Sequence, residues 1–303
     1  MISPKYNSLA SSIRICFLLA LLSFGVFLAL NENSLVNAAG IFLIGAMFTH
    51  AVEIQHQCLH YSAFHSRRIN KVVGMLLGLP TLTSFHAYRR SHLKHHRNLG
   101  TSLDAPFFTY RFVREPSLVS LFYDLFGISH IKSSLYAIFR HGDSRLIPIT
   151  EGDEPSNFSE EFDYGLMGFL MVCATFSAFA FGSVIILKLW ILPFVLVAQP
   201  LHFLIELPEH LGCEADSTDI LRNTRTILGT RFSRWFTNYN NMHVEHHLEP
   251  TLSMDQTPEV YAKIAGQHKY ISETYVDFYL SLYRSRKSLR FTSASDRYAR
   301  GHA

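Results

Sequence analysis

The sequence predicts an all-α integral membrane protein in which four transmembrane helices form two hairpins joined to a cytoplasmic helical cap. Three observations lead to this fold class. Hydrophobic residues make up 48% of the 303 residues and charged residues only 17%, a low charge content for a soluble protein of this length. Long apolar runs occur in two closely spaced pairs. Lysine and arginine are concentrated outside these runs.

The first pair of apolar runs lies near the beginning of the chain and predicts crossings at about 15–30 and 38–53. A signal peptide cleaved near residues 36–38 is the alternative interpretation of the first run. Because the second apolar run begins at that point, the sequence favours a helical hairpin.

The second pair predicts crossings at 165–187 and 189–207, with only Lys188 between them.

Two other segments are partly apolar. The stretch from Val72 to Phe85 is too short to span a bilayer, so we expect it to be re-entrant or interfacial. Residues 117–139 mix aromatic, aliphatic and polar side chains, and we expect them to lie along the membrane surface.

Positive charge predicts the orientation. Residues 54–163 and residues 207–303 each contain 12 Lys and Arg, residues 1–14 contain two, and the loop 31–37 contains none. Positively charged segments are retained on the cytoplasmic side. We therefore expect both termini, the segment 54–163 and the segment 208–303 to be cytoplasmic.

The composition predicts one domain over residues 1–303, because no linker rich in Pro, Gly or Ser divides the chain. The polar tail from about 288 to 303 is expected to be disordered.

A net charge of +3 without a dense basic run argues against nucleic acid as a partner. The four cysteines occur singly, which supports neither a disulfide framework nor a zinc–cysteine site.

Histidine is unusually abundant, with 17 residues, and it occurs in three short clusters. The first has the spacing HxxxH, and the other two have the spacing HxxHH. Residues at i, i+3 and i+4 project from one side of a helix, so each cluster can direct two or three imidazoles at one point. Chance would give on the order of 0.05 HxxHH matches at this histidine frequency, and two occur. The clusters consist of His56 and His60; His92, His95 and His96; and His243, His246 and His247.

Neutral imidazole is a ligand for iron, copper and zinc, and eight imidazoles exceed the needs of one ion. The sequence therefore predicts two metal ions, with all three clusters on the same face of the membrane. His210 is expected to be a ninth ligand, because Pro208 can bend the end of the fourth crossing toward the clusters. His202, two turns earlier, is the alternative. The isolated histidines are expected to have structural or solvent-exposed roles.

The ordered histidine clusters between paired hairpins resemble the membrane fatty-acid desaturase and hydroxylase superfamily, from about residue 38 to residue 255. Other phrases agree with this resemblance: His96-Arg-Asn-Leu-Gly100 followed by Asp104, Asn223-Thr-Arg-Thr226, and Asn240-Asn-Met-His243. Glu209-His210-Leu-Gly resembles a phrase of membrane alkane monooxygenases that supplies an additional ligand.

The resemblance implies a non-haem di-iron centre, molecular oxygen and an external supply of two electrons. The sequence has neither a haem-binding His-Pro-Gly-Gly phrase nor paired CxxC motifs. We therefore expect electrons from a separate protein of the ferredoxin, rubredoxin or cytochrome b5 type. The absence of a fused carrier and of an ER-retrieval signal favours a bacterial inner membrane over the ER.

Histidine ligands need hydrogen-bond acceptors that orient their outer nitrogens. Asp104 and Asn240 are the candidates for this role, Asn240 because helical spacing would place it on the same face as His243. Asp104 has an alternative role as a loop or helix-capping residue.

The expected function is oxygen-dependent introduction of a double bond into a lipid or fatty-acyl chain. A hydroxylase, monooxygenase or ketolase of the same architecture, acting on a lipid-like or other hydrophobic metabolite, is the main alternative. A membrane metal transporter would place its ligands at mid-membrane, which the cluster positions disfavour. A carboxylate di-iron bundle would need a second ExxH phrase besides Glu53-Ile-Gln-His56 and further glutamates.

Overall fold

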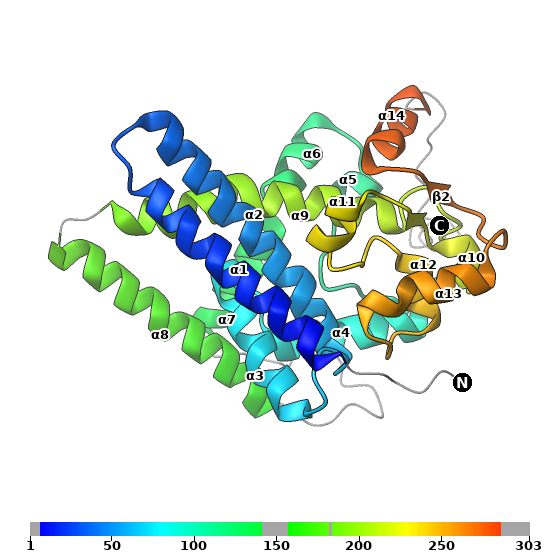
Figure 1. Ribbon diagram of the computed structural model, residues 1–303, viewed down its shortest axis with the longest axis horizontal. Helices are drawn as coiled ribbons and strands as arrows, with labels where there is room; N and C mark the ends of the chain where they lie inside the picture. Colours follow the sequence, from blue (N-terminus) through cyan, green and yellow to red (C-terminus); the bar gives the residue numbers. More distant parts are fainter. Residues whose placement is uncertain (1–6, 141–156, 182–183, 286–303) are drawn as a thin grey trace, which may run out of the picture.

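The computed structural model describes residues 7–140, 157–181 and 184–285 (Figure 1). In these residues almost all regular structure is helical, as the sequence predicts. The only paired strands in the described ranges are β1 (Thr226–Ile227) and β2 (Ile271–Ser272), which run parallel. The predicted disordered tail at 288–303 lies outside the described residues.

Four helical segments are long and apolar enough to cross a membrane, and each overlaps a predicted crossing. The first three are α1 (Ser8–Ala29), α2 (Ser34–Leu59) and α8 (Asn157–Phe181). The fourth covers Leu187–Glu209 and is built from four shorter helical elements. These are η3 (Leu187–Ile191), η4 (Pro193–Ala198), α9 (Gln199–Glu206) and η5 (Leu207–Glu209).

Helix α2 lies at the centre of the molecule. Every residue from Ile44 to Leu59 is buried, although this stretch contains Thr49, Gln55 and Gln57. A helix that is buried all round must satisfy its polar groups within the protein. Thr49 Oγ1 accordingly donates to the carbonyl of Ala198 at 3.2 Å, and Gln55 Nε2 donates to the carbonyl of Thr83 at 3.1 Å.

Two glycines of α2 allow neighbouring helices to approach its backbone closely on two sides. A Cβ at Gly40 would lie 2.2 Å from the backbone nitrogen of Ala29 in α1. A Cβ at Gly45 would lie 2.4 Å from Cβ of Val197 in η4. Without side chains at these positions, α1 and η4 pack directly against the α2 backbone, and the two helices α1 and α2 lie side by side in Figure 1.

The fourth segment differs from the regular helix that the sequence suggests. Elements η3 and η4 are π-helical, with wider turns than an α-helix. Pro193 and Pro200 lack an amide hydrogen and disturb the regular i to i−4 hydrogen bonds, which gives a local reason for the wider turns. Pro208 then lies in the single turn η5 that ends the segment.

The segment between α2 and α8 folds into short helices rather than into continuous runs. It contains α3 (Arg67–Gly78), η1 (Leu79–Thr81), α4 (Phe85–Asn98), α5 (Arg111–Arg114), α6 (Leu118–Leu125) and α7 (Ile128–Phe139). The apolar stretch 72–85 is therefore the end of one amphipathic helix and the turn before the next. The predicted surface segment 117–139 is divided at Gly127, where φ is +58°.

The C-terminal part contains α10 (Ile220–Asn223), α11 (Arg231–Phe236), α12 (His243–Leu248), η6 (Met254–Gln256), α13 (Thr257–Ile264) and α14 (Tyr275–Ser285). These elements gather on one side of the molecule (Figure 1). On the opposite side, α8 is held to α4 by ion pairs from Arg90 to Glu160 at 2.6 Å and from His86 Nδ1 to Asp163 at 3.1 Å.

The packing at Gly45 predicts a large effect of a small substitution. Gly45→Val should destabilise the protein by about 1–3 kcal/mol, because the new side chain must displace Val197 or the η4 backbone. Thermal unfolding of the detergent-solubilised protein measures this change. Gly165→Val is the matched control, since nothing lies within 4 Å of a Cβ built at Gly165. Equal melting temperatures for the two variants would contradict the close approach.

Candidate metal centre

The structure brings the eight cluster histidines and His210 together, although they come from four separate parts of the chain. They form two groups, in each of which the potential ligand atoms lie within 4.8 Å of one another. The first histidine group consists of His56, His60, His92, His96 and His246, and the second histidine group consists of His95, His210, His243 and His247. Each of the α4 and α12 clusters contributes to both groups, so the two groups are neighbours.

The Nε2 atoms of the first histidine group converge. The Nε2 atom of His92 lies 2.7 Å from that of His56, 2.8 Å from that of His60 and 2.9 Å from that of His96. The Nε2 atoms of His96 and His246 are 3.0 Å apart. Five ring nitrogens therefore surround one small volume.

The second histidine group converges in the same way. The Nε2 atoms of His95 and His210 are 3.3 Å apart, and those of His243 and His247 are 3.1 Å apart. His202, the alternative candidate for a ninth ligand, belongs to neither group. Its Nδ1 instead faces Glu206 at 3.5 Å.

Local structure explains how each element presents its imidazoles. On α4, His92 and His96 lie one turn apart, and His95 between them points toward the second group. At the end of the fourth membrane segment, the single turn η5 ends the helix and directs His210 toward His95. Helix α12 is fixed through the fully buried Glu245, which accepts hydrogen bonds from Thr226 Oγ1 and pairs with His268 Nε2, each at 2.6 Å.

Hydrogen-bond acceptors hold the outer nitrogens of three histidines of the second histidine group. Asp104 Oδ1 lies 2.8 Å from His95 Nδ1, Asn240 Oδ1 lies 3.2 Å from His243 Nδ1, and the carbonyl of Asn223 lies 3.0 Å from His210 Nδ1. Both predicted orienting residues thus contact a cluster histidine. The reason given for Asn240 was wrong, however. Asn240 does not share a helix with His243, because α12 begins at His243 and Asn240 lies in the turn that follows the positive-φ residues 238 and 239.

These contacts allow a test of whether the residues fit a metal ion. When an acceptor binds Nδ1, the proton of a neutral imidazole resides on Nδ1 and the Nε2 lone pair is free. Such lone pairs on His95, His210 and His243 then face one another, an arrangement that is repulsive without a positive charge between them. Imidazoles with an anchored outer nitrogen and a free inner nitrogen are characteristic metal ligands. The donor set of the second group therefore fits a metal ion, and the first group offers five converging ring nitrogens within 4.8 Å of one another.

Burial favours the neutral form of His210 and of most of the cluster histidines. It lowers the pKa of His210 to about 3, and the neighbouring His95 adds to the effect. Burial also holds the pKa of six other cluster histidines well below the ordinary value, with further lowering by adjacent imidazoles. These six are His60, His92, His96, His243, His246 and His247.

Several isolated histidines have partners of another kind. His50 Nδ1 lies 2.7 Å from the carbonyl of Phe236, and His130 Nε2 lies 2.9 Å from the carbonyl of Thr81. His86 and His268 pair with carboxylates. These contacts agree with structural roles. His141 and His302 lie outside the described residues.

Sequence reasoning missed Glu209, whose Oε2 lies 3.1 Å from His243 Nε2. It also missed Tyr88, whose ring stacks on His56 at 6.2 Å and meets His92 edge-on at 5.7 Å. The position of Glu209 next to His210 was a usable signal. Nothing in the local sequence distinguishes Tyr88 from the other aromatic residues.

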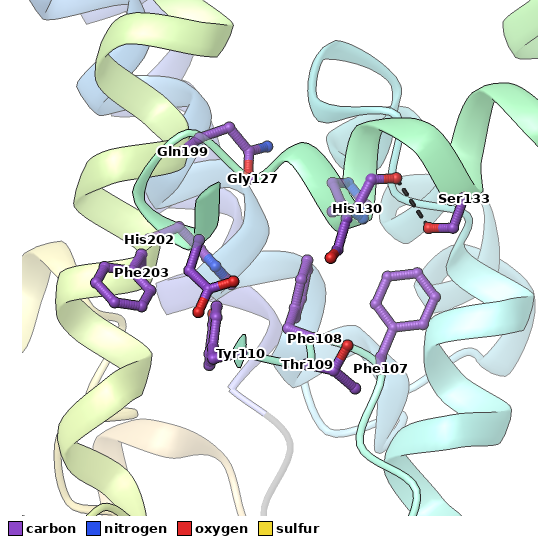
Figure 2. Close-up of a pocket in the computed structure, with 12 residues that line it drawn as sticks. Phe107, Phe108, Thr109, Tyr110, Gly127, His130, Ser133, Gln199, His202 and Phe203 are labelled. Atoms are coloured by element: carbon purple, nitrogen blue, oxygen red, sulfur yellow. Dashed lines mark hydrogen bonds between the residues drawn. The ribbon is translucent and has the colours of Figure 1, made fainter. Parts of the chain in front are cut away.

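A cavity of about 280 Å³ lies between α7 and α9, with residues 107–110 along one edge (Figure 2). Aromatic rings form one wall. Phe107 and Phe108 contact Tyr88, with ring centroids 4.9 and 5.2 Å apart, so a single aromatic residue separates this wall from the first histidine group. The lining also includes the polar residues Thr109, Asp124, Ser129, His130, Ser133, Gln199 and His202.

A second hollow, a more open groove of about 430 Å³, lies on the other side of α9 and is almost entirely apolar. Leu201, Leu204, Ile205 and residues of α14 line it. Its inner residue is Tyr275. Burial raises the pKa of the Tyr275 hydroxyl, and the carboxyl groups of Glu209 and Glu53 raise it further.

A family model described as fatty acid desaturase matches residues 33–279. The chain belongs to the fatty acid desaturase family. The match extends from the residue before α2 into α14, and it contains all nine histidines of the two groups.

Relatives of this desaturase-family chain include enzymes from plants and bacteria. The chain is 28% identical to a chloroplastic omega-3 fatty acid desaturase of Brassica napus, over 55% of this chain and 43% of that protein. It is 27% identical to dihydrorhizobitoxine desaturase of Bradyrhizobium elkanii, over 69% of this chain and 62% of that protein. It is 27% identical to a chloroplastic sn-2 acyl-lipid omega-3 desaturase (ferredoxin) of Arabidopsis thaliana, over 55% of this chain and 39% of that protein. The chain thus spans about half the length of these curated relatives.

The contact between Asp104 and His95 predicts a loss of metal affinity in Asp104→Ala. Removing a carboxylate that orients a ligand histidine typically weakens metal binding 10- to 100-fold, and we expect a value of this order. Competition with a chelator, followed by metal analysis, measures the change. Asp104→Asn should retain more affinity, because its amide oxygen can still accept the hydrogen bond. If all three proteins bind metal equally, Asp104 is only a loop residue.

The lowered histidine pKa values predict a pH dependence. Between about pH 3 and the ordinary value of 6.5 the unfolded chain binds more protons than the folded metal-free protein, so stability increases with pH there. We therefore expect the melting temperature of the metal-free protein to fall as the pH is lowered from about 6.5 to 5. Protonation should release bound metal over the same range. A melting temperature that rises on acidification would contradict the burial of neutral imidazoles.

Proposed function

We propose that the protein is an oxygen-dependent di-iron oxidoreductase that introduces a double bond into a lipid or fatty-acyl chain. The observation that supports the proposal most strongly is the pair of neighbouring histidine groups in a chain of the fatty acid desaturase family. Two closely spaced redox metal ions suit the oxidation of an unactivated C–H bond, which needs both electrons and a strong oxidant.

In this proposal the first and second histidine groups each hold one iron ion. Iron, with O2 and two external electrons, supplies the oxidising chemistry when bound. The chain contributes placement. Asp104, Asn240 and the carbonyl of Asn223 orient three imidazoles, while burial excludes water from the centre.

We further propose that the four membrane segments form two hairpins and that the remaining helices form a cytoplasmic cap. The short connection between α1 and α2 and their direct packing support the first hairpin. The distribution of Lys and Arg supports the orientation of the cap. The same cap would receive the external electron donor, of the ferredoxin, rubredoxin or cytochrome b5 type. A bacterial inner membrane in preference to the ER stays a prediction.

The substrate is proposed to enter the cavity between α7 and α9. Its aromatic wall contacts Tyr88, which lies against two ligands of the first histidine group. Two aromatic layers, the wall of Phe107 and Phe108 and then Tyr88, would separate a chain segment in the cavity from the first histidine group. Three relatives are named as lipid or fatty-acid omega-3 desaturases, which supports an acyl substrate.

The polar part of the cavity lining favours one alternative. Asp124, His130, Gln199 and His202 could bind hydroxyl, carbonyl or amine groups that a simple alkyl chain lacks. This observation supports a hydroxylase or related monooxygenase that acts on a smaller hydrophobic metabolite with a polar group. A metal transporter is disfavoured, because α4 and α12 lie outside the four membrane segments.

Expression with a matched reductase, followed by mass spectrometry of lipids and metabolites, tests the proposal. Desaturation removes two hydrogens from the substrate, whereas hydroxylation adds one oxygen. A product that contains the new oxygen, or no oxygen-dependent product at all, would overturn the desaturase assignment.

Substitution of a ligand should abolish turnover without preventing membrane insertion. We expect His95→Ala and His246→Ala to lose at least about 100-fold in activity and to lose bound iron, since each removes a donor from one group. His65→Ala is the control, because His65 is exposed and belongs to neither group. Iron content and oxygen-dependent turnover are measured on the same membrane preparation. If these variants remain active and the protein contains one zinc ion and no iron, the proposed di-iron centre is wrong.

Two bulky substitutions distinguish the cavity from the apolar groove. Ser129→Phe fills the cavity and should reduce turnover at least about tenfold while the iron content remains unchanged. Val276→Trp obstructs the groove on α14 and should have a smaller effect. The opposite pattern would place the substrate in the groove.

A further inference from the structure

Helix α14 lies at the edge of the molecule, and its exposed side is divided into two stripes (Figure 1). Each stripe has the spacing i, i+4 and i+7, which places its members on one face of a helix. The apolar stripe consists of Val276, Leu280 and Tyr283, which are 65%, 46% and 62% exposed. The polar stripe consists of the exposed residues Asp277, Ser281 and Arg284. Such a division is typical of a helix that lies along a membrane surface.

The third side of α14 packs against the fourth membrane segment. Phe278 is buried in an apolar cluster that includes Phe203 of α9. The hydroxyl of Tyr279 donates a hydrogen bond to the backbone carbonyl of Leu204 at 2.7 Å. In a regular helix the amide of residue 208 would bind this carbonyl, but Pro208 has no amide hydrogen. These contacts fix the rotation of α14, so its apolar stripe stays exposed.

The apolar stripe borders the apolar groove beside α9. Val276 and Leu280 line the groove from α14, and its volume of about 430 Å³ suits a small apolar ligand. The lining residues from α9 are Leu201, Leu204 and Ile205. These three residues belong to the candidate membrane segment Leu187–Glu209 and lie in its second half. A bilayer that surrounds this segment therefore continues to the groove.

Helix α6 also exposes apolar residues beside α9. Leu121 and Leu125 pack on the same apolar cluster as Phe278, while Leu118 and Phe122 are exposed. Two helices at the end of the fourth segment thus share an uncovered apolar surface. Such surfaces mark contacts with a membrane or with another protein, and their position next to a membrane segment favours the membrane.

Positive charge accompanies the apolar stripe. Arg284 is exposed in the last turn of α14. The next charged residues in the sequence are also basic, and they are Arg286, Lys287 and Arg290. Basic residues beside an apolar helix face attract the anionic headgroups of the cytoplasmic leaflet. A bilayer phospholipid therefore matches both the apolar surface and the charge of this part of the chain.

We propose that α14 lies in the headgroup region of the cytoplasmic leaflet and that the groove between α9 and α14 binds one acyl chain of a bilayer phospholipid. This inference rests on the proposed crossing and orientation of the fourth segment. It does not depend on the metal centre or on the reaction. The lipid chain covers the exposed apolar residues of the groove and is separate from a substrate in the cavity on the other side of α9.

Tryptophan fluorescence tests the contact with lipid, in nanodiscs that each hold one chain in a bilayer of phosphatidylcholine and phosphatidylglycerol. Leu280→Trp places an indole on the apolar stripe, and Ser281→Trp places one on the polar stripe. Phospholipids brominated in the upper part of their acyl chains should quench the Leu280→Trp indole at least about twofold and leave the Ser281→Trp indole unchanged. Wild-type nanodiscs give the background from Trp190 and Trp235.

Native mass spectrometry of the detergent-solubilised protein tests the occupancy of the groove. Wild type should retain one phospholipid. Val276→Trp fills the groove and should retain at least about tenfold less, whereas Val119→Trp on α6 alters an exposed apolar residue outside the groove and should retain lipid as wild type does. Added phospholipid should raise the melting temperature of delipidated wild type but not that of Val276→Trp. Equal melting temperatures of the two delipidated proteins exclude misfolding as the cause.

Three results would overturn the proposal. Equal quenching of the two indoles would remove α14 from the headgroup region. Equal lipid retention by wild type and Val276→Trp would remove the lipid from the groove. A retained free fatty acid, or a dimer without retained lipid, would assign the groove to a different occupant. None of these measurements involves iron or turnover, so the proposed enzymatic function and this lipid site can fail independently.

Discussion

The structure depends on the close packing of nine imidazoles whose inner nitrogens face one another in two groups. Such an arrangement is unfavourable by itself, because lone pairs converge in a region from which water is excluded. Asp104, Asn240 and the backbone carbonyl of Asn223 hold three of these imidazoles in place by contacting their outer nitrogens. A cation at each centre turns the same geometry from repulsive to attractive. Metal binding, as proposed, would therefore be linked to the stability of the fold.

The helices of the candidate membrane segments also position the histidine groups. Helix α2 continues beyond its apolar part, so it includes His56 of the first histidine group and is followed directly by His60 of the same group. The fourth segment ends in a 3-10 turn at Pro208, which delivers Glu209 and His210 together. Gly40 and Gly45 let α1 and η4 approach the α2 backbone. Close packing around α2 is what makes its position, and that of His56, reproducible.

Two hollows lie beside α9, and they offer different surroundings to the proposed substrate. The cavity combines an aromatic wall with several polar side chains, whereas the groove is almost wholly apolar. An acyl chain suits the aromatic wall, and a substrate with a polar group suits the rest of the cavity. The unequal surroundings of the two histidine groups add a second asymmetry. Tyr88 lies beside the first group, and carboxylates lie beside the second.

The sequence alone determined the helical fold class, the four long apolar segments and the three histidine clusters, because apolar run length and i, i+3, i+4 spacing are local properties. It could not determine which histidines share an ion, since His95 separates from His92 and His96 only when α4 packs beside α12 and His210. It also missed Glu209, which becomes a site residue only through its contact with His243, 34 positions away in the chain. Contacts between distant residues arise from tertiary packing, and local spacing holds no information about them.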